Sequence, residues 1–247
     1  ASGDGVRTRA YASTPLALRD YQLHACNACN PSVDTFRSGC VEFGCGTGKT
    51  WIGTELIRRS RAPAVVVAQH SISVVQWVTL LCEKLDDGHR EPLVVTLDDA
   101  REVWRSRDPV PDVLVTTYNS LVQVTHRMTT TREIIRAVGD DGVARASDDA
   151  PEDWLLSLLM CERFGLLVLD EVHVSVADHF VLSSYLRASV VCGLSGSLVR
   201  EDDRMMRLAL TVGPILATYT PSRTVHATIV TVACVDEDGS GRIARAL

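Results

Sequence analysis

The stretch "VEFGCGTGKTW", residues 41–51, decides the fold of this chain. A glycine-rich turn joins an apolar run, "CVEF" at 40–43, to a segment of helical period that begins at Lys49. A strict phosphate-loop pattern, G-x-x-x-x-G-K-[ST], requires glycine at residue 43, where this chain has Phe43. The strand before the turn and the helix after it still favour a phosphate-binding loop, because a helix N-terminus offers free N–H groups and partial positive charge to anionic oxygens.

Each residue type in this loop fits a role in holding a nucleotide. Glycines let the backbone wrap phosphate oxygens, a lysine reaches the outer phosphates, and a threonine hydroxyl is a ligand for Mg2+. We therefore expect the nucleotide to be bound by Gly44, Cys45, Gly46, Thr47, Gly48, Lys49 and Thr50, with Thr50 on the metal.

An acidic partner for this loop lies in "LLVLDEVH", residues 166–173. Asp170 ends an apolar run, so its carboxylate belongs at the carboxyl edge of the predicted sheet, where ligands of such sheets bind. Asp170 is expected to bind Mg2+, and Glu171 to polarise the attacking water. An acidic pair after a strand also serves as a helix cap. Together with the upstream loop it favours catalysis, with Asp170, Glu171 and Lys49 as the catalytic residues.

Composition limits the classes of protein that this chain can represent. Hydrophobic residues make up 46% and charged residues 23% of 247 residues, which is typical of one large globular domain. No apolar run is long enough to span a membrane, so no membrane partner is expected. The net charge of -6 argues against a surface that grips nucleic acid everywhere, but leaves room for a local basic groove.

The chain contains eight cysteines, of which Cys26, Cys29, Cys40 and Cys45 form a loose array. Structural zinc requires four thiolates that converge on one point. Cys40 opens an apparent strand and Cys45 lies inside the glycine loop, so this arrangement is disfavoured. Small buried thiols in a reducing compartment are the preferred interpretation.

Strand-like and helix-like segments alternate along the chain. Continuous apolar runs, typical of parallel strands buried on both faces, occur at 40–43, 63–68, 92–97, 112–118, 164–170, 189–195 and 226–234. Segments of helical period occur at 20–29, 49–60, 73–85, 151–164, 177–188 and 202–212. This order predicts an α/β fold with a doubly wound, mostly parallel sheet and helices on both faces.

One domain is expected to span residues 16–234, after an N-terminal extension at 1–15. Residues 139–153 are rich in acid and glycine without period, and are interpreted as a solvated loop insertion. The polar tail at 235–247 is interpreted as the start of a linker to a second domain that is absent here.

Beyond these patterns, "GCGTGKT" and "DEVH" together resemble superfamily 2 helicases of the DExH type, whose first motif tolerates a residue other than glycine at position 43. Further matches narrow the resemblance to the first, RecA-like domain of the XPB family, the xeroderma pigmentosum group B helicases of the transcription and repair factor TFIIH and their archaeal relatives. They are "LRDYQ" at 18–22, "SVVQW" at 73–77, "TTYNSL" at 116–121 and "GLSGSLVREDD" at 193–203.

This resemblance implies a DNA-dependent ATPase acting as a helicase or translocase in excision repair and transcription initiation. Its cofactors would be ATP and Mg2+. Its partners would be DNA, a second RecA-like domain and subunits of a TFIIH-like complex in the nucleus. The isolated chain would hydrolyse ATP weakly, because the arginines of the second domain complete such a site.

The resemblance also assigns roles to single residues. Gln22, with Arg19 near it, would sense adenine. His173 would couple the nucleotide to the third motif, here Ser195-Gly196-Ser197. The residues in motifs associated with DNA are Gln76, Trp77, Thr117, Tyr118, Arg200, Glu201 and Asp202. Trp77 also fits the core of an amphipathic helix, and 200–203 also fits a solvated helix start.

The third motif departs from the family pattern, because Gly196 stands where the family has alanine. Glycine loosens the backbone there by about 0.5 to 1 kcal/mol. This departure keeps open a regulatory paralogue that binds ATP with weak or no helicase activity. A duplex translocase of a related remodelling or restriction enzyme, from the same superfamily, also stays open.

Overall fold

The structure of this chain is a computed structural model. It describes residues 11–12, 15–32, 35–97, 99, 111–126, 164–175, 186, 188–198, 204–221, 234–235 and 241–242. Several predicted segments lie wholly or almost wholly outside these residues: the helices at 151–164 and 177–188, the strand at 226–234, the insertion at 139–153, and most of the extension and of the linker.

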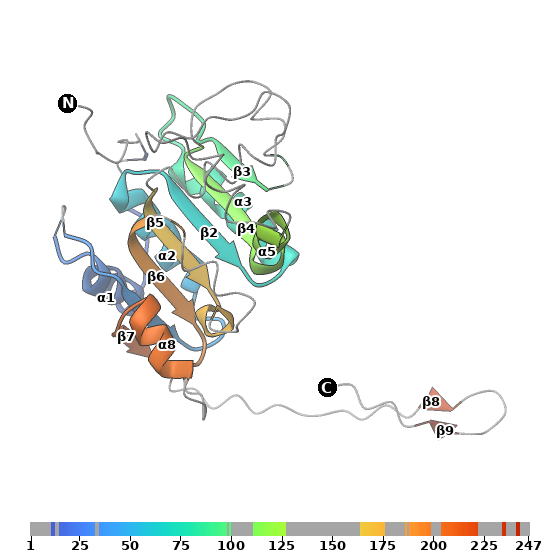
Figure 1. Cartoon of the computed structure of the whole chain (residues 1–247). Coiled ribbons are helices and arrows are strands. Elements are labelled where there is room, and N and C mark those ends of the chain that lie inside the picture. Colours follow the sequence, from blue (N-terminus) through green and yellow to red (C-terminus); the bar gives the residue numbers. More distant parts are fainter. Residues whose placement is uncertain are drawn as a thin grey trace, which may run out of the picture.

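A seven-stranded sheet forms the centre of the molecule (Figure 1). Every neighbouring pair of its strands is parallel, which confirms the predicted class of sheet. In spatial order the strands are β3 (Val94–Thr96), β4 (Val113–Thr117), β2 (Ala64–Ala68), β5 (Phe164–Asp170), β6 (Ala188–Ser195), β1 (Gly39–Phe43) and β7 (Ile215–Tyr219).

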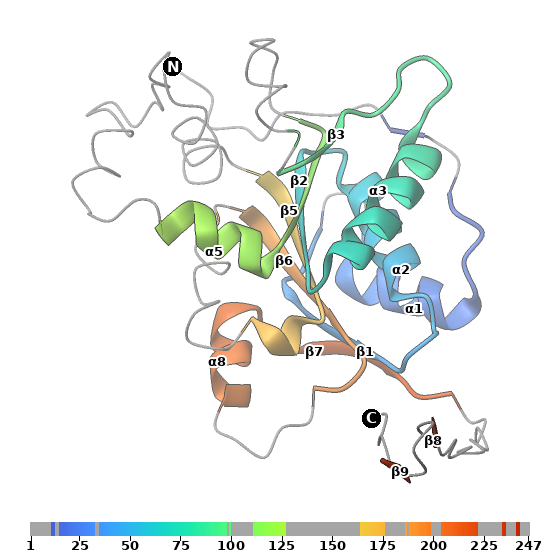
Figure 2. The same ribbon diagram turned by 90° about the vertical axis from the view of Figure 1, so that its right-hand side faces the viewer.

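Helices cover both faces of this sheet, as Figure 2 shows. One face carries α1 (Asp20–Cys29), α2 (Lys49–Ser60) and α3 (Ser71–Leu85). The other carries α5 (Tyr118–His126), α8 (Arg204–Thr211) and the short 3-10 helix η1 (Val172–Val174). The doubly wound arrangement predicted from the sequence is therefore confirmed.

Two hydrophobic cores lie on the two faces of the sheet. Successive strand residues point to opposite faces, so Val66 of β2 packs into the core under α1 to α3, while Val65 and Val67 pack into the other. Val168 and Leu167 of β5 divide in the same way. Burial on both sides explains why these strands are continuous apolar runs.

The order of the strands brings three carboxyl ends together. β6 lies between β1 and β5, and its Ser195 pairs with Glu42 while its Leu194 pairs with Asp170. The glycine loop after β1, the acidic pair at the end of β5 and the third motif after β6 therefore leave the sheet at the same edge. This is the edge at which open α/β sheets bind ligands.

Among the elements of five residues or more, β7 and α5 were not predicted from the sequence. β7 adds a parallel edge strand beside β1, on which Ile215 and Thr218 are exposed. α5 begins at Tyr118, where the sequence was interpreted as the end of a strand. A second, antiparallel sheet consists only of β8 (Cys234–Val235) and β9 (Gly241–Arg242).

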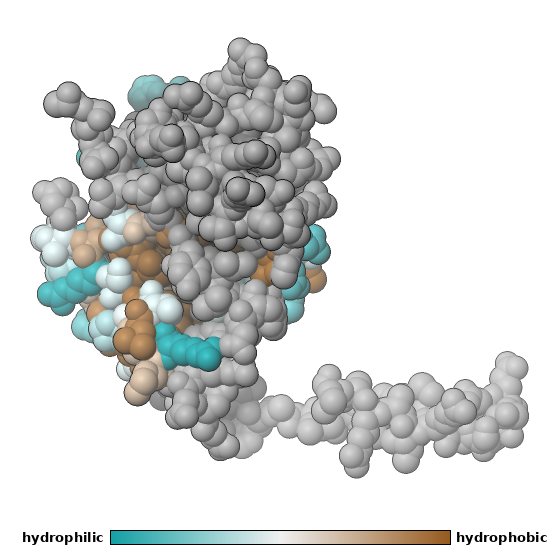
Figure 3. All heavy atoms as spheres, viewed as in Figure 1, coloured by the Kyte–Doolittle hydropathy of each residue, from teal (hydrophilic) through white to brown (hydrophobic). Residues whose placement is uncertain are grey.

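The outer surface of α8 carries exposed apolar side chains. Met206 is 72% exposed and Leu210 is 81% exposed. In Figure 3, brown apolar spheres lie next to teal polar ones at the position of α8. Within the described part of the chain, Leu208 and Val212 provide the buried contacts that attach this segment to the sheet.

Candidate functional site

The glycine loop between β1 and α2 has the backbone conformation that its glycines permit. Gly46 and Gly48 have φ angles of 74° and 81°, in the left-handed region that side chains disfavour. A Cβ at Gly48 would lie 2.4 Å from Nε2 of Gln22, so a larger residue there would have to displace that side chain. The Thr47 hydroxyl donates to the carbonyl of Gly44 at 2.6 Å and closes the turn.

The amides at the start of α2 are available to an anion. Within the described residues, no backbone or side-chain acceptor pairs with the N–H groups of Gly46, Gly48, Lys49 or Thr50. The first amides of a helix have no intrahelical partner and carry partial positive charge. This part of the loop therefore fits phosphate oxygens.

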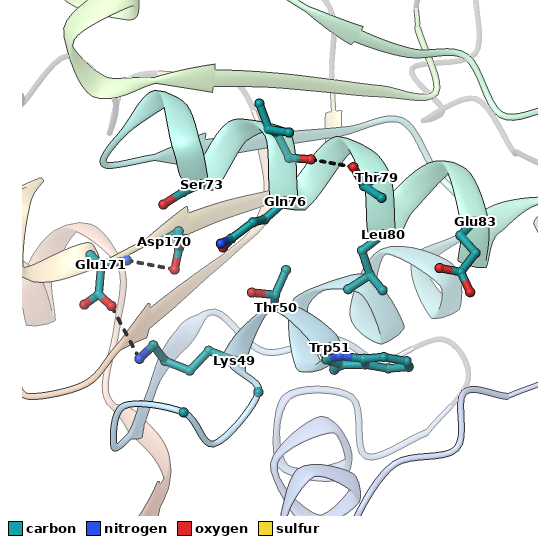
Figure 4. A pocket seen from close by; sticks show the side chains of 13 residues that line it. Lys49, Thr50, Trp51, Ser73, Gln76, Thr79, Leu80, Glu83, Asp170 and Glu171 are labelled. Carbon is teal, nitrogen blue, oxygen red and sulfur yellow. Dashed lines mark hydrogen bonds and ion pairs between the residues drawn. The ribbon is translucent and has the colours of Figure 1, made fainter.

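Lys49 and Glu171 face each other across the site (Figure 4). The Lys49 ammonium lies 3.4 Å from Oε1 of Glu171 and donates to the carbonyl of Phe43 at 3.3 Å. Glu171 itself has a φ of 49°, unusual for a residue with a side chain. Its Oε2 accepts a hydrogen bond from the Gly196 amide at 3.4 Å. The two charged groups neutralise each other, and both line the same cavity.

Asp170 is nearly buried and is held by two hydrogen bonds. The indole Nε1 of Trp77 donates to Oδ2 at 3.0 Å, and the Glu171 amide donates to Oδ1 at 3.1 Å. Removal from water raises the pKa of the Asp170 carboxyl, and the negative charge of Glu171 adds to this, while the Trp77 bond and the Lys49 charge oppose it. Such a carboxylate favours a cationic ligand that restores its charged form.

A cavity of about 700 Å³ joins these groups. In Figure 4 the side chains of Lys49, Thr50, Gln76, Asp170 and Glu171 converge on it from α2, α3 and the end of β5. The Thr50 hydroxyl and the Asp170 carboxylate are oxygen ligands of the kind that Mg2+ prefers. The residues that line this cavity therefore fit a nucleotide with bound Mg2+. The predicted catalytic and metal residues lie together here.

A second cavity, of about 330 Å³, lies beside the first, near the start of α1. It is lined by Ala17, Arg19, Gln22, Gly46, Thr47, Gly48 and Trp51. Gln22 donates to the carbonyl of Thr47 at 2.8 Å and accepts from the Arg19 amide at 2.9 Å, which fixes its amide at the wall. Arg19 and Gln22 thus lie together in the wall of a cavity beside the glycine loop.

The third motif contacts the acidic pair through His173. Nδ1 of His173 lies 2.8 Å from the Ser195 hydroxyl, which donates its hydrogen to the Ser197 carbonyl at 2.9 Å. Nδ1 is also 3.5 Å from Oε2 of Glu171. The predicted coupling residues form one connected group.

The residues expected to contact DNA divide into three sets. Gln76 is exposed and lines the larger cavity, and Thr117 caps α5, accepting a hydrogen bond from the Ser120 amide at 3.0 Å. Trp77 and Tyr118 were expected in a DNA-facing motif, but each is 1% exposed, so neither side chain can reach DNA. Their apolar rings are buried in the two cores. Arg200, Glu201 and Asp202 lie outside the described residues.

Three residues of the site were missed from the sequence. Trp51 lines both cavities, and only its position two residues after Lys49 indicated this. Tyr21 stacks on Tyr219 of β7 with ring centroids 4.0 Å apart, and its hydroxyl donates to the Thr47 carbonyl at 3.3 Å. Tyr219 belongs to the strand that the sequence analysis missed, so no local pattern could reveal this pair.

The cysteines of the loose array differ in their exposure to solvent. Cys26 and Cys40 are buried, and burial raises the pKa of each thiol to about 12. Cys45 is exposed in the glycine loop. Across the described part of the chain, no three His, Cys, Asp or Glu side chains are grouped so as to hold a metal ion.

None of the helices that the structure describes combines the length and the apolar composition needed to cross a bilayer.

The fold and the site define a RecA-like nucleotide-binding domain, with a phosphate loop on one strand end and an acidic pair on another. Residues 15–200 match the model of the family described as "Type III restriction enzyme, res subunit", and the chain belongs to that family.

Similar proteins agree with the predicted resemblance to XPB. The chain is 28% identical over 221 residues to the DNA repair helicase/translocase XPB-R of Trypanosoma brucei brucei, covering 80% of this chain and 28% of that protein. It is 29% identical over 201 residues to the DNA 3'-5' helicase XPB of Kineococcus radiotolerans, covering 80% and 29%. It is 29% identical over 182 residues to subunit XPB1 of the general transcription and DNA repair factor IIH of Arabidopsis thaliana, covering 73% and 20%. The predicted resemblance to the XPB helicases is confirmed.

The chain spans less than a third of the length of these relatives. Among solved structures, it is similar to the UvsW helicase from bacteriophage T4, with a TM-score of 0.53 and 15% identity, covering 85% of this chain and 64% of that one. It is also similar to the Pyrococcus furiosus Hef helicase domain, with a TM-score of 0.54 and 16% identity, covering 82% and 37%. At these identities the likeness establishes the fold.

Proposed function

We propose that this chain is the ATP-binding domain of a DNA-dependent ATPase that works as a helicase or translocase, in excision repair and transcription initiation. The observation that carries the proposal is the convergence of Lys49, Thr50, Asp170 and Glu171 on one cavity. The names of the relatives, which include repair helicases and factor IIH subunits, support the choice of DNA as the partner.

The residues of the site divide the work of hydrolysis. The free amides at the start of α2 would bind the phosphates, and Thr50 and Asp170 would hold Mg2+, which neutralises phosphate charge in such sites. When a nucleotide binds, the Lys49 ammonium would leave Glu171 and the Phe43 carbonyl and contact phosphate oxygens instead. This exchange would leave the Glu171 carboxylate free to accept a proton from the attacking water.

Coupling to DNA would run through the third motif. His173 contacts both Glu171 and Ser195, so a change at the carboxylate alters the bonds of the segment after β6. Arg200, Glu201 and Asp202 follow that segment in sequence, and we propose that they and Gln76 respond to DNA.

The partners would be DNA, a second RecA-like domain that supplies arginines to the phosphates, and the subunits of a TFIIH-like complex. This proposal would locate the protein in the nucleus. A relative from Kineococcus radiotolerans indicates that the family also occurs outside nucleated cells.

The test uses the complete protein and measures ATP hydrolysis with and without duplex DNA. Lys49→Ala and Glu171→Gln should each abolish DNA-stimulated hydrolysis, and Glu171→Gln should retain ATP binding. Unchanged turnover in either variant would overturn the proposal. ATP binding by the wild type without DNA-stimulated turnover would favour the regulatory alternative, and triplex displacement without strand separation would favour the duplex translocase.

A further inference from the structure

Trp77 of α3 reaches the acidic pair from the interior of the molecule. It is 1% exposed, and its Nε1 donates to Oδ2 of Asp170 at 3.0 Å although the two residues are 93 positions apart in the sequence. A buried tryptophan usually finds a partner for its N–H group. Here that partner is the predicted metal ligand.

The ring of Trp77 has little freedom to move. A Cβ at Gly53 of α2 would lie 2.4 Å from Cη2 and 3.1 Å from Cζ3 of the ring, so the indole occupies the space that any side chain at Gly53 would need. Interiors are close-packed, so a ring held in this way keeps its orientation. The N–H group therefore points at Asp170 from a fixed position.

The carboxylate of Asp170 is correspondingly fixed. One oxygen accepts from Trp77 and the other from the Glu171 amide, so neither can rotate without losing a bond. On the other face of the sheet, the buried hydroxyl of Tyr118 donates to the Asp170 carbonyl at 3.1 Å. The side chain and the backbone of Asp170 are thus held by separate aromatic residues from α3 and α5.

An indole is well suited to this task. It is a hydrogen-bond donor only, so it cannot act as a metal ligand or as a base. It is also uncharged, so it orients the carboxylate without competing with a divalent cation, as an arginine or lysine would. Groups that orient metal ligands in this way typically change metal affinity by about 10- to 100-fold.

We propose that Trp77 is a positioning residue that fixes the Asp170 carboxylate for Mg2+ and so links the position of α3 to the nucleotide site. This inference rests on the proposed function, because it needs Asp170 to bind magnesium. Gln76, the neighbouring residue on α3, is exposed and lines the same cavity, so a partner that moves this helix would also move the indole donor.

The experiment compares Trp77→Phe with the wild-type chain. Phenylalanine keeps a flat apolar ring and removes the N–H group. ATP binding is measured by calorimetry over a range of Mg2+ concentrations and in EDTA, well below the unfolding midpoint of every variant. We expect the Mg2+ concentration for half-maximal tight binding to rise about 10- to 100-fold, and ATP affinity in EDTA to stay within about twofold of wild type.

Two further variants separate positioning from general damage. Tyr11→Phe removes a buried hydroxyl that bonds the Ala62 and Asp112 carbonyls, remote from the site, and should leave the Mg2+ dependence unchanged. Gly53→Ala keeps the indole N–H but forces the ring to move, and should raise the Mg2+ concentration for half-maximal tight binding as Trp77→Phe does.

A folded Trp77→Phe chain with the wild-type Mg2+ dependence would overturn the inference. So would an equal loss of ATP affinity with Mg2+ and in EDTA, because that pattern indicates only structural damage. Should Trp77→Phe not fold, a wild-type Mg2+ dependence in Gly53→Ala would overturn it equally. If the wild-type chain itself bound no ATP, the proposed function would fail first and this inference with it.

Discussion

Replacing Gly196 by alanine, the residue that the family has in this position of the third motif, tests whether the departure damages the site. An added Cβ would lie 3.5 Å from the Lys49 ammonium, 3.5 Å from Sγ of Cys45 and 3.8 Å from the Phe43 carbonyl, all ordinary contact distances. Gly196 is not among the glycines with positive φ in the described part of the chain, which are Gly46, Gly48, Gly88 and Gly213. Neither space nor backbone conformation therefore requires glycine here.

The expected size of the effect follows from the unfolded chain. Alanine in a conformation that it adopts without strain stabilises a protein by about 0.4 to 1 kcal/mol, because the unfolded backbone has fewer states to lose. For a chain of this length, 1 kcal/mol shifts the melting temperature by about 2 to 4 °C, so we expect a rise of about 1 to 4 °C. Circular dichroism measures this shift, and calorimetry should find ATP affinity within about twofold of wild type. A destabilisation of more than about 1 kcal/mol, or a loss of ATP binding, would refute the steric argument.

Three other substitutions give results that the contacts predict. Gly48→Ala should destabilise the chain by at least about 1 kcal/mol in urea unfolding, because its φ is 81° and Nε2 of Gln22 would lie 2.4 Å from the new Cβ; an unchanged midpoint would contradict this. Gln22→Ala should weaken ATP binding by roughly 3- to 10-fold and reduce the preference over GTP in competition assays, whereas an unaltered preference would remove Gln22 from the base site. Burial alone would raise the pKa of Glu55, but hydrogen bonds and charges from Arg58 and Arg59 outweigh it and hold that pKa below its ordinary value of 4.5. Glu55→Gln should therefore lower the free energy of unfolding by about 3 kcal/mol near neutral pH. This loss should shrink as pH falls from 4.5 through the lowered native pKa; a loss that stayed constant in acid would show that the charge is irrelevant.

The elements around the nucleotide site were well predicted from the sequence. Helices 20–29 and 49–60 and the strand at 164–170 have the expected bounds. The glycine loop and the buried strands carry strong local signals: a required turn, a helix start and a continuous apolar run. These local features place the motif residues at the ends of their strands, at one edge of the sheet. The meeting of Lys49 with Glu171 could therefore also be predicted.

Other parts depend on contacts between distant segments. β7 is stabilised by pairing with β1, far away in the sequence. Buried and exposed positions alternate only weakly along its five residues. α5 was not recognised because the predicted strand ran one residue too far, to Tyr118. In the structure the strand ends at Thr117, which caps the helix. The amphipathic pattern around Trp77 fits a core position, but no sequence pattern indicates that its N–H group meets Asp170.

The central claim is that this chain binds ATP with Mg2+ through the loop at 44–50. Calorimetric titration of the wild-type chain and of Lys49→Ala tests it most directly, with circular dichroism to confirm that both are folded. The site predicts saturable one-to-one binding by the wild type and a loss of about 10- to 100-fold in affinity for Lys49→Ala, as expected for a lost charged hydrogen bond. Equal affinities, or no binding by a folded wild-type chain, would contradict the claim.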